Sequence, residues 1–210
     1  MVLGRSKHKT ADRQLELVQA ALHLAANKSP LEVTTAELAQ AIGITQGGVF
    51  KHFESKAAIW AAALDWAHDA LMAELEQAAQ TVPEGQVLRA LRAVFFAHVQ
   101  FVERYPGVPR LVFQELQHAE LTPLKLQAQH LLADYRSLLM RLLERAQAAG
   151  QVHAELNLQH VALLFIGAIQ GLIMQSMING QMSGLRASAQ GIFNIYQASL
   201  SGVASDSEAS

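Results

Sequence analysis

The feature that most restricts the fold is a helix-period pattern of apolar residues that runs through almost the whole chain. All five prolines fall between the periodic segments and none interrupts one. We therefore predict an all-α fold of about nine helices. The expected helices span about residues 11–27, 35–41, 45–52, 55–80, 86–104, 109–118, 123–149, 158–179 and 185–200.

Capping residues mark the starts of the short helices near the N-terminus. Thr34 and Glu37 have the spacing of a capping box, in which each side chain satisfies a free backbone N–H. Gly43 follows where a left-handed residue would end that helix. Thr45 and Ser55 are candidate N-caps of the next two helices. In the first helix, an apolar stripe of Leu15, Val18, Leu22 and Ala25 is expected to face the core.

The composition predicts a cytoplasmic protein that buries apolar surface against a partner. Of the 210 residues, 51% are apolar and only 16% are charged. This charged fraction is low for a soluble monomer and favours a homo-oligomer. The absence of cysteine fits a reducing compartment and excludes a disulfide framework and a thiolate site. The N-terminal run "MVLGRSKHKTADR" has no apolar core, so we do not expect a signal peptide.

The segment at residues 158–179, "LQHVALLFIGAIQGLIMQSMIN", is long enough to cross a membrane. His160, Gln170 and Gln175 interrupt it and no basic cluster flanks it, so we predict no membrane span. We expect this helix and the last one to form a homodimer interface as a four-helix bundle. The face assigned to that interface on the last helix comprises Leu185, Ala189, Ile192, Phe193, Tyr196 and Leu200.

Gly47 and Gly48 stand together inside a short helical segment, where each costs roughly 1 kcal/mol relative to alanine. The preceding helix, the Gly43 turn and this segment have the dimensions of a helix-turn-helix, whose second helix enters the major groove of DNA. Without side chains, the first turn can approach bases or phosphates closely. The formal charge agrees with this interpretation, because residues 1–56 have +2 and the remainder has −4.

We therefore predict double-stranded DNA as a partner and assign the contacts around the second helix. Gln46 and Lys51 are candidates for base edges, while Thr35, Thr45 and Lys56 are candidates for phosphates. Val49 and Phe53 are expected in the core, and for His52 a phosphate contact and a structural role remain equally open. The complete predicted DNA-binding set is Thr35, Thr45, Gln46, Gly47, Gly48, Phe50, Lys51, His52 and Lys56.

Residues 34–60, "TTAELAQAIGITQGGVFKHFESKAAIW", resemble the signature of the TetR family of bacterial transcriptional regulators. The resemblance covers about residues 10–60, and the later helices agree with that family's ligand domain only in number and length. It implies a dimer that binds a palindromic operator, in which a small molecule changes the spacing of the two DNA-binding domains. Of the two possible responses, release or promotion of DNA binding, we predict a repressor that the small molecule releases. The family usually has tyrosine where this chain has Phe50, so the hydroxyl-to-phosphate bond is missing here.

The domain boundaries that we expect are 1–56 for DNA binding, 57–202 for effector binding and dimerisation, and 203–210 for a disordered tail. Pockets in helical proteins form between bundle helices with a few polar groups on an apolar lining. The aromatic content favours a small hydrophobic or aromatic effector. The candidate lining residues, part of which are ordinary core, are Phe95, His98, Phe101, Phe113, Tyr135, Phe165, Gln170 and Met174.

Two alternatives without DNA binding remain, a helical ligand carrier and a metal-dependent helical-bundle enzyme. Nine histidines are present, and Glu115 with His118 has the Glu-x-x-His spacing of di-iron bundles. A second such pair is missing, since Asp65 with His68 supplies only the shorter acid. We therefore predict no catalytic residue, no metal site and no cofactor.

Overall fold

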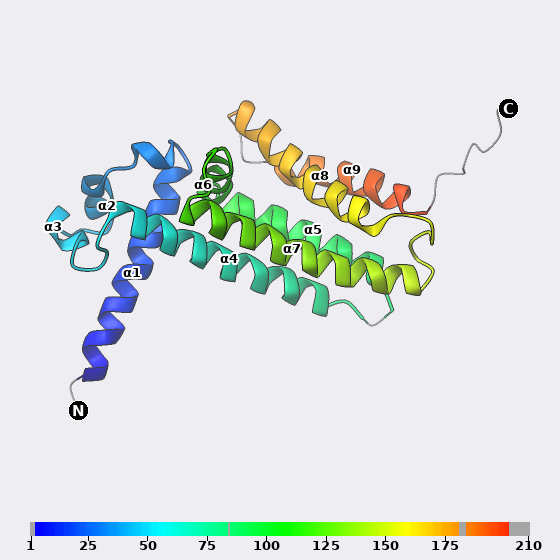
Figure 1. Cartoon of the computed structure of the whole chain (residues 1–210), viewed down its shortest axis with the longest axis horizontal. Coiled ribbons are helices and arrows are strands. Elements are labelled where there is room, and N and C mark those ends of the chain that lie inside the picture. The colour runs from blue at the N-terminus through cyan, green and yellow to red at the C-terminus, as the bar shows by residue number, and fades with distance from the viewer. Residues whose placement is uncertain (1–2, 84, 181–183, 202–210) are drawn as a thin grey trace. The chain divides into compact units, whose positions relative to one another are not determined.

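The computed structural model describes residues 3–83, 85–180 and 184–201 (Figure 1). Within these ranges the chain forms nine α-helices and one short 3₁₀ helix, and no strand, which confirms the predicted all-α class. The predicted tail at 203–210 lies outside the described residues. The elements are α1 (Leu3–Ala25), η1 (Pro30–Glu32), α2 (Thr35–Ala41), α3 (Gln46–Val49), α4 (Lys56–Gln80), α5 (Val87–Arg104), α6 (Gly107–Leu116), α7 (Pro123–Ala148), α8 (Leu158–Ile178) and α9 (Leu185–Ser199).

The chain divides into two compact units that are not consecutive in sequence. Unit 1 contains Met1–Ala70 and Arg104–Leu131, and unit 2 contains Leu71–Glu103 and Leu132–Ser210. The long helices α4 and α7 each contribute residues to both units. This structural division differs from the functional boundary after residue 56 that the sequence suggests, and that boundary stays a prediction.

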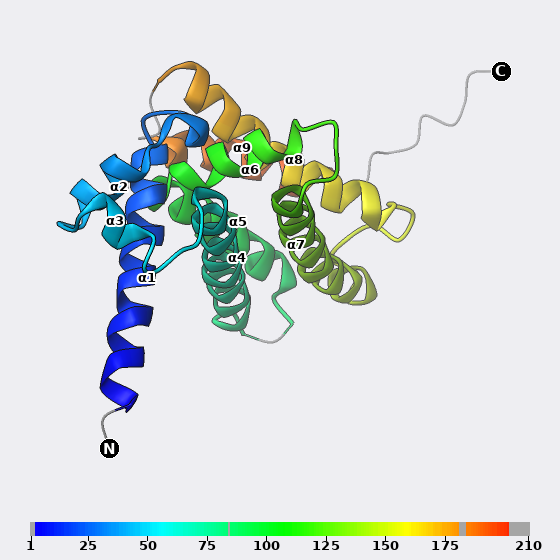
Figure 2. The same cartoon turned by 60° about the vertical axis from the view of Figure 1, so that its left-hand side comes forward.

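Unit 1 is built around α1, which contacts η1, α2 and α6 (Figure 2). Gly107, the first residue of α6, lies so close to α1 that an added Cβ would be 1.9 Å from the carbonyl oxygen of Leu22. Arg110 Nε also donates to the carbonyl oxygen of Ala26 at 3.2 Å. The fully buried side chains of this core include Leu17, Leu22, Val33, Leu38, Val49, Ile59, Leu64 and Leu111.

Unit 2 has an aromatic core, and α8 and α9 pack side by side in it (Figure 1). Because aromatic rings bury large apolar areas, this cluster is a major source of stability for the unit. The fully or almost fully buried side chains include Leu75, Leu91, Phe95, Tyr135, Leu139, Leu143, Phe165 and Phe193.

The stripe predicted on the first helix is confirmed at Val18, Leu22 and Ala25, which are buried, but one of its residues and the face of α9 were assigned wrongly. Leu15 was expected in the core of the first helix but is 42% exposed. The face of α9 that was assigned to a dimer interface is instead buried inside its own unit, with Phe193 and Tyr196 in contact with the ring of Phe165 or Phe95. Periodicity identifies which face of a helix is apolar but not which neighbour covers it.

Helix boundaries differ most at the N-terminal end. Helix α1 begins at Leu3, earlier than expected, and α3 ends at Val49, because residues 50–52 form a turn. The prediction of a core position for Val49 is confirmed, whereas Phe53 is only half-buried.

Candidate nucleic-acid interface and ligand sites

Local hydrogen bonds fix the helix-turn-helix geometry in unit 1. The Thr34 hydroxyl accepts from the backbone N–H of Glu37 at 3.2 Å, and the Glu37 carboxylate accepts from the N–H of Thr34 at 2.8 Å. Gly43 has a φ of +70°, as the predicted left-handed turn requires. The Thr45 hydroxyl then accepts from the N–H of Gly48 at 3.1 Å and caps α3. These sequence predictions are confirmed.

An ion pair strengthens the first of these caps. Glu37 also binds the ammonium group of Lys28, which precedes η1. The bond from Lys28, together with the bonds from Thr34, lowers the pKa of Glu37 to about 2. The capping carboxylate is therefore ionised at any physiological pH, which keeps the start of α2 in place.

The start of α3 presents backbone rather than side chains to the outside. A Cβ added at Gly47 would meet no atom within 4 Å, so the surface in front of this residue is open. At Gly48 an added Cβ would lie 3.3 Å from the Thr45 hydroxyl, which caps the same helix. Gln46 precedes both glycines, and its Nε2 donates to Oγ1 of Thr35 at 2.9 Å.

The polar and aromatic residues after the glycines have different surroundings. Lys51 is exposed and has no partner among the described residues, and Phe50 is 50% exposed. The Nδ1 atom of His52 is buried without a hydrogen-bond partner in the described part of the chain. The carbonyl oxygen of His52 accepts from Nε2 of Gln14 at 2.9 Å, which links the end of this segment to α1.

Lys56 has a structural contact that the sequence did not indicate. Its ammonium group donates to the carbonyl oxygens of Leu31 and Val33 at 2.7 and 2.9 Å. It therefore holds the segment between η1 and α2, and one N–H remains for a phosphate. The side chain of Ser55 accepts from the N–H of Ala58 and caps α4, as predicted.

Four of the predicted effector residues lie together in unit 2. The ring of Phe165 lies 5.2 Å from that of Phe95 and 6.4 Å from that of Tyr135, and Tyr135 contacts His98. Sequence reasoning missed two further members of this cluster, Phe193 and Tyr196, because their stripe on α9 was assigned to an interface. The Tyr196 hydroxyl, a polar group within that apolar stripe, was the sequence signal that could have placed this residue in the cluster.

In this cluster Tyr135 and Tyr196 are buried, and His98 is half-buried. Nδ1 of His98 lies 3.1 Å from the Tyr135 hydroxyl, and burial lowers the pKa of His98 to about 4. Burial also raises the pKa of Tyr135, with a further contribution from Tyr196, and raises that of Tyr196. The Tyr196 hydroxyl is buried and has no hydrogen-bond partner within the described residues, so it remains able to bind one.

The other effector candidates are dispersed. Phe113 belongs to unit 1, whereas all the others belong to unit 2. Phe101 is fully buried and Gln170 is half-buried. Met174 is 40% exposed on α8, so in this chain it is a surface residue.

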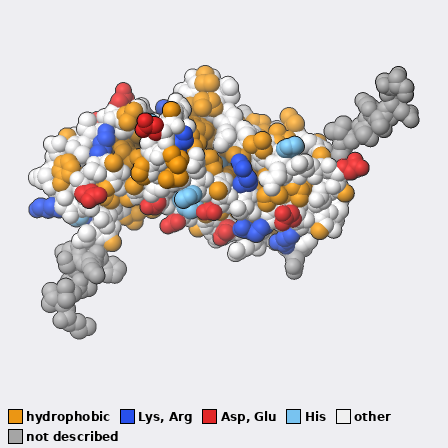
Figure 3. Space-filling view, in the orientation of Figure 1, with side chains coloured by type: hydrophobic (Ala, Val, Ile, Leu, Met, Phe, Trp, Pro, Cys, Tyr) orange, Lys and Arg blue, Asp and Glu red, His pale blue; other side chains and the backbone are white. Residues whose placement is uncertain are grey.

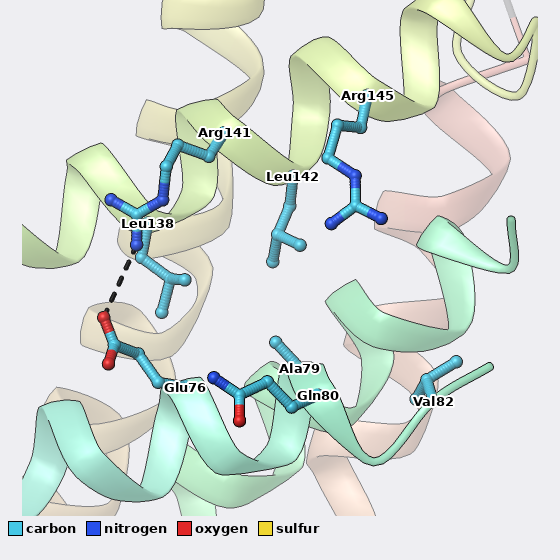
Figure 4. A pocket seen from close by; sticks show the side chains of 8 residues that line it. All are labelled: Glu76, Ala79, Gln80, Val82, Leu138, Arg141, Leu142 and Arg145. Carbon is cyan, nitrogen blue, oxygen red and sulfur yellow. Dashed lines mark hydrogen bonds and ion pairs between the residues drawn. The ribbon is translucent and has the colours of Figure 1, made fainter. Parts of the chain in front are cut away.

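Unit 2 also has a surface groove of about 530 Å³ between the end of α4 and the second half of α7 (Figure 4). Leu138 and Leu142 lie along it, and Arg145 points into it. Arg141 lies 3.5 Å from the carboxylate of Glu76 across the groove. Both partners are about half exposed, so this ion pair contributes little to stability.

The outer face of α8 and α9 is apolar and uncovered. Only 39% of the most apolar window of α8 is buried, although the helix is long and apolar enough to cross a bilayer by length and composition alone. Figure 3 shows hydrophobic side chains gathered along the C-terminal part of α8. The exposed residues on the two helices include Leu163, Leu164, Gly167, Gly171, Met174, Ile178, Gly191 and Ile195.

The histidine and acid pairs do not form a larger cluster. Glu115 Oε2 lies 3.7 Å from Nε2 of His118, and Asp65 accepts a hydrogen bond from Gln127. Nowhere in the described ranges do three or more His, Asp or Glu side chains come close enough together to hold a metal ion.

Two family profiles match the chain, and together they cover more than half of it. The profile described as "Bacterial regulatory proteins, tetR family" matches residues 17–63, which include α2 and α3. The profile described as "Tetracyclin repressor-like, C-terminal domain" matches residues 112–192. The chain belongs to the TetR family.

A curated relative is similar to this chain in sequence, and two solved structures are similar to it in fold. The chain is 30% identical over 105 residues to the nucleoid occlusion factor SlmA of Vibrio vulnificus, a match that covers 50% of this chain and 53% of that protein. The chain thus spans about half the length of the first curated relatives it matches. Its fold is similar to that of the transcriptional regulator FadR of Bacillus subtilis in complex with stearoyl-CoA, with a TM-score of 0.75, 16% identity and coverage of 90% and 98%. The ketosteroid regulator KstR2 of Mycobacterium tuberculosis is similar, with a TM-score of 0.74, 18% identity and coverage of 91% and 96%.

Proposed function

We propose that this TetR-family regulator is a cytoplasmic homodimer that represses transcription from a palindromic operator and is released by a small hydrophobic or aromatic effector. The observation that supports DNA binding most directly is the open surface at Gly47, between the exposed residues Gln46 and Lys51. Stability alone would favour alanine at this position, whereas close approach to a duplex requires a bare backbone.

The proposed DNA contacts are those of the predicted set, from Thr35 to Lys56. Selection of duplexes from a random pool with the purified protein, followed by sequencing, tests this proposal. A palindrome is expected, because a dimer with two-fold symmetry reads two half-sites. Its affinity should fall steeply with salt, since lysines that neutralise phosphates release counterions. If the protein binds no duplex of any sequence at low ionic strength, the proposal is refuted and a ligand carrier is favoured.

We place the dimer interface on the exposed face of α8 and α9. This face combines large apolar side chains with Gly167, Gly171 and Gly191, and such small residues let helices approach closely. A Gly171→Glu substitution should leave each chain folded, because a Cβ there meets nothing within 4 Å, but should separate the dimer. Light scattering measures the mass, and Ala73→Glu on the exposed side of α4 is the matched control.

The effector is proposed to bind in unit 2, at the aromatic cluster that contains Phe95, His98, Tyr135 and Phe165. The buried Tyr196 hydroxyl without a partner would hydrogen-bond a polar group of the effector. Helix α4 contributes to both units, so a change at its C-terminal half can reach the DNA-binding unit. The effector must bind the DNA-incompetent state more tightly than the DNA-competent state, because a ligand that binds both states equally does not shift the equilibrium between them.

A titration tests this coupling. Candidate effectors should lower operator affinity, and operator DNA should weaken effector binding by the same factor. The Tyr196→Phe variant should bind the effector less tightly while its free energy of unfolding stays within about 1 kcal/mol, since the hydroxyl has no partner to lose. An effector that binds tightly without changing operator affinity would show that the two sites are not coupled.

A further inference from the structure

Unit 1 contains a groove of about 500 Å³, a volume typical of small-molecule sites. η1, the first turns of α4, the end of α6 and the start of α7 line it. Glu115 of α6 lies in this lining and is only 5% exposed. It is the single buried charged side chain in the ranges that the structure describes. Glutamate is almost never buried unless it is paired, so the buried carboxylate of Glu115 is expected to have a partner.

The carboxylate of Glu115 has weak partners. Nε2 of Gln114 donates to its Oε1 at 3.3 Å, and Nε2 of His118 lies 3.7 Å from its Oε2, beyond hydrogen-bond distance. Lys56 also lines the groove, but its ammonium group donates to the carbonyl oxygens of Leu31 and Val33. No lysine or arginine of the described chain pairs with Glu115, so a buried negative charge remains incompletely compensated.

The rest of the lining is mainly apolar. Leu31, Trp60 and Leu124 are its large apolar side chains, of which Leu31 is exposed, Leu124 half-buried and Trp60 only 5% exposed. The indole of Trp60 is an aromatic group of the kind that binds cations. The other titratable acid in the lining, Glu54, adds a second negative charge. An anionic ligand would be repelled by both acids, and a neutral one would leave the charge of Glu115 unpaired and still removed from water.

We propose that this groove binds a small lipophilic cation, with an amine or quaternary ammonium group on the carboxylate of Glu115. The apolar body of the ligand lies against Leu31, Trp60 and Leu124. This site is distinct from the effector site proposed above, because all of its residues belong to unit 1.

The position of the groove links its occupant to the DNA-binding elements. Gln114, which donates to Glu115, also accepts a hydrogen bond from the hydroxyl of Ser29 at 3.0 Å. Ser29 is the N-cap of η1, and η1 leads directly into the cap of α2. A cation that engages Glu115 therefore acts on the segment that positions α2, and operator affinity changes when the groove is occupied.

Calorimetric titration of the full chain without DNA tests the proposal with three probes of one skeleton: phenylbutylamine, phenylbutanol and phenylbutyrate. At about pH 7.5 the amine is protonated and the acid is ionised. The amine should bind at least about tenfold more tightly than the alcohol, and the acid should not compete with it. Equal affinities of amine and alcohol in the wild-type chain would overturn the proposal without any variant.

Glu115→Gln removes the charge and keeps the shape, so the amine should bind it no better than the alcohol. Glu120→Gln is the matched control, since Glu120 is exposed and outside the groove. If Glu115→Gln does not fold, Ala61→Arg places a cation in the lining and should abolish amine binding. A Glu115→Gln variant that still binds the amine more tightly than the alcohol, or a folded Ala61→Arg variant that still binds the amine, would overturn the site. Operator affinity that is unchanged at saturating amine would overturn the link to α2.

Discussion

Gln46 donates from Nε2 to Oγ1 of Thr35 at 2.9 Å, and thereby joins the first residue of α3 to the first residue of α2. Both residues were predicted to contact DNA, and in the free protein each is the partner of the other. The bond fixes the Gln46 amide to the first residue of α2 before any duplex arrives. Less side-chain entropy is then lost on binding, which favours affinity.

Substitution of Gly47 by alanine should change stability and operator affinity in opposite directions. The added methyl group meets open space, and alanine restricts the unfolded chain and favours helix, so the free energy of unfolding should rise by about 0.5–1 kcal/mol. Operator affinity should fall by at least about tenfold, because the methyl group separates the backbone from the duplex. Urea denaturation and fluorescence anisotropy measure the two effects.

Gly48→Ala is the comparison for that variant. Its Cβ would lie 3.3 Å from the Thr45 hydroxyl that caps α3, so little or no gain in stability is expected. If Gly47→Ala binds the operator as tightly as the wild type does, the close approach at this residue does not occur.

Substitution of Lys51, a candidate for base edges, and of Lys56, a candidate for phosphates, should differ in the effect on stability. Lys51→Met removes an exposed group without a described partner, so the free energy of unfolding should change by less than about 0.5 kcal/mol. Lys56→Met removes both bonds to the carbonyl oxygens of Leu31 and Val33 and should cost about 1–3 kcal/mol.

Salt titration tests the proposed phosphate contact of Lys56. Loss of one phosphate contact should reduce the slope of log affinity against log salt by about 0.9, at specific and unrelated duplexes alike. A wild-type slope for Lys56→Met would mean that Lys56 acts only through the segment between η1 and α2.

Sequence reasoning succeeded where the interaction is local. The Thr34–Glu37 box, the Gly43 turn and the Thr45 cap each involve residues at most three positions apart, so spacing alone specifies them. Helix number and most helix boundaries followed from periodicity and proline positions in the same way.

Long-range partners could not be predicted because spacing does not encode them. Gly107 lies against Leu22, far away in sequence, and nothing around Gly107 indicates that contact. The inward orientation of Phe193 and Tyr196 depends on which helices cover α9, and the apolar stripe alone fits an internal core or an external interface equally well. The aromatic residues of α5, α7 and α8 were found as candidates because rings are usually buried, but their grouping needed the fold.

His98 should make the protein sensitive to mild acid. Its pKa is about 4 in the folded chain against an ordinary 6.5, so between these values the unfolded chain binds more protons. The stabilisation is complete above about pH 6.5 and is lost as the pH falls to about 4, with a limit of about 3 kcal/mol. Urea denaturation at a series of pH values measures it.

His98→Gln should unfold more easily at neutral pH, because it disturbs the contact with Tyr135, yet should show a flatter dependence on pH across that window. The exposed His160 provides the control, since His160→Gln should keep the wild-type slope. Identical slopes for the two variants would show that the imidazole of His98 is not the group that responds to acid.

Gly107→Ala should destabilise unit 1 by displacing α6 from α1. An added Cβ would lie 1.9 Å from the carbonyl oxygen of Leu22 and 3.1 Å from the Cβ of Ala25, so the helices must separate, at a cost of about 1–3 kcal/mol or more. The double variant Gly107→Ala with Ala25→Gly removes only the second contact. In urea denaturation this double variant should be as unstable as Gly107→Ala, because the carbonyl oxygen of Leu22 is still present. Recovery of wild-type stability would mean that the side chain of Ala25, and not the backbone of α1, limits how closely α6 approaches.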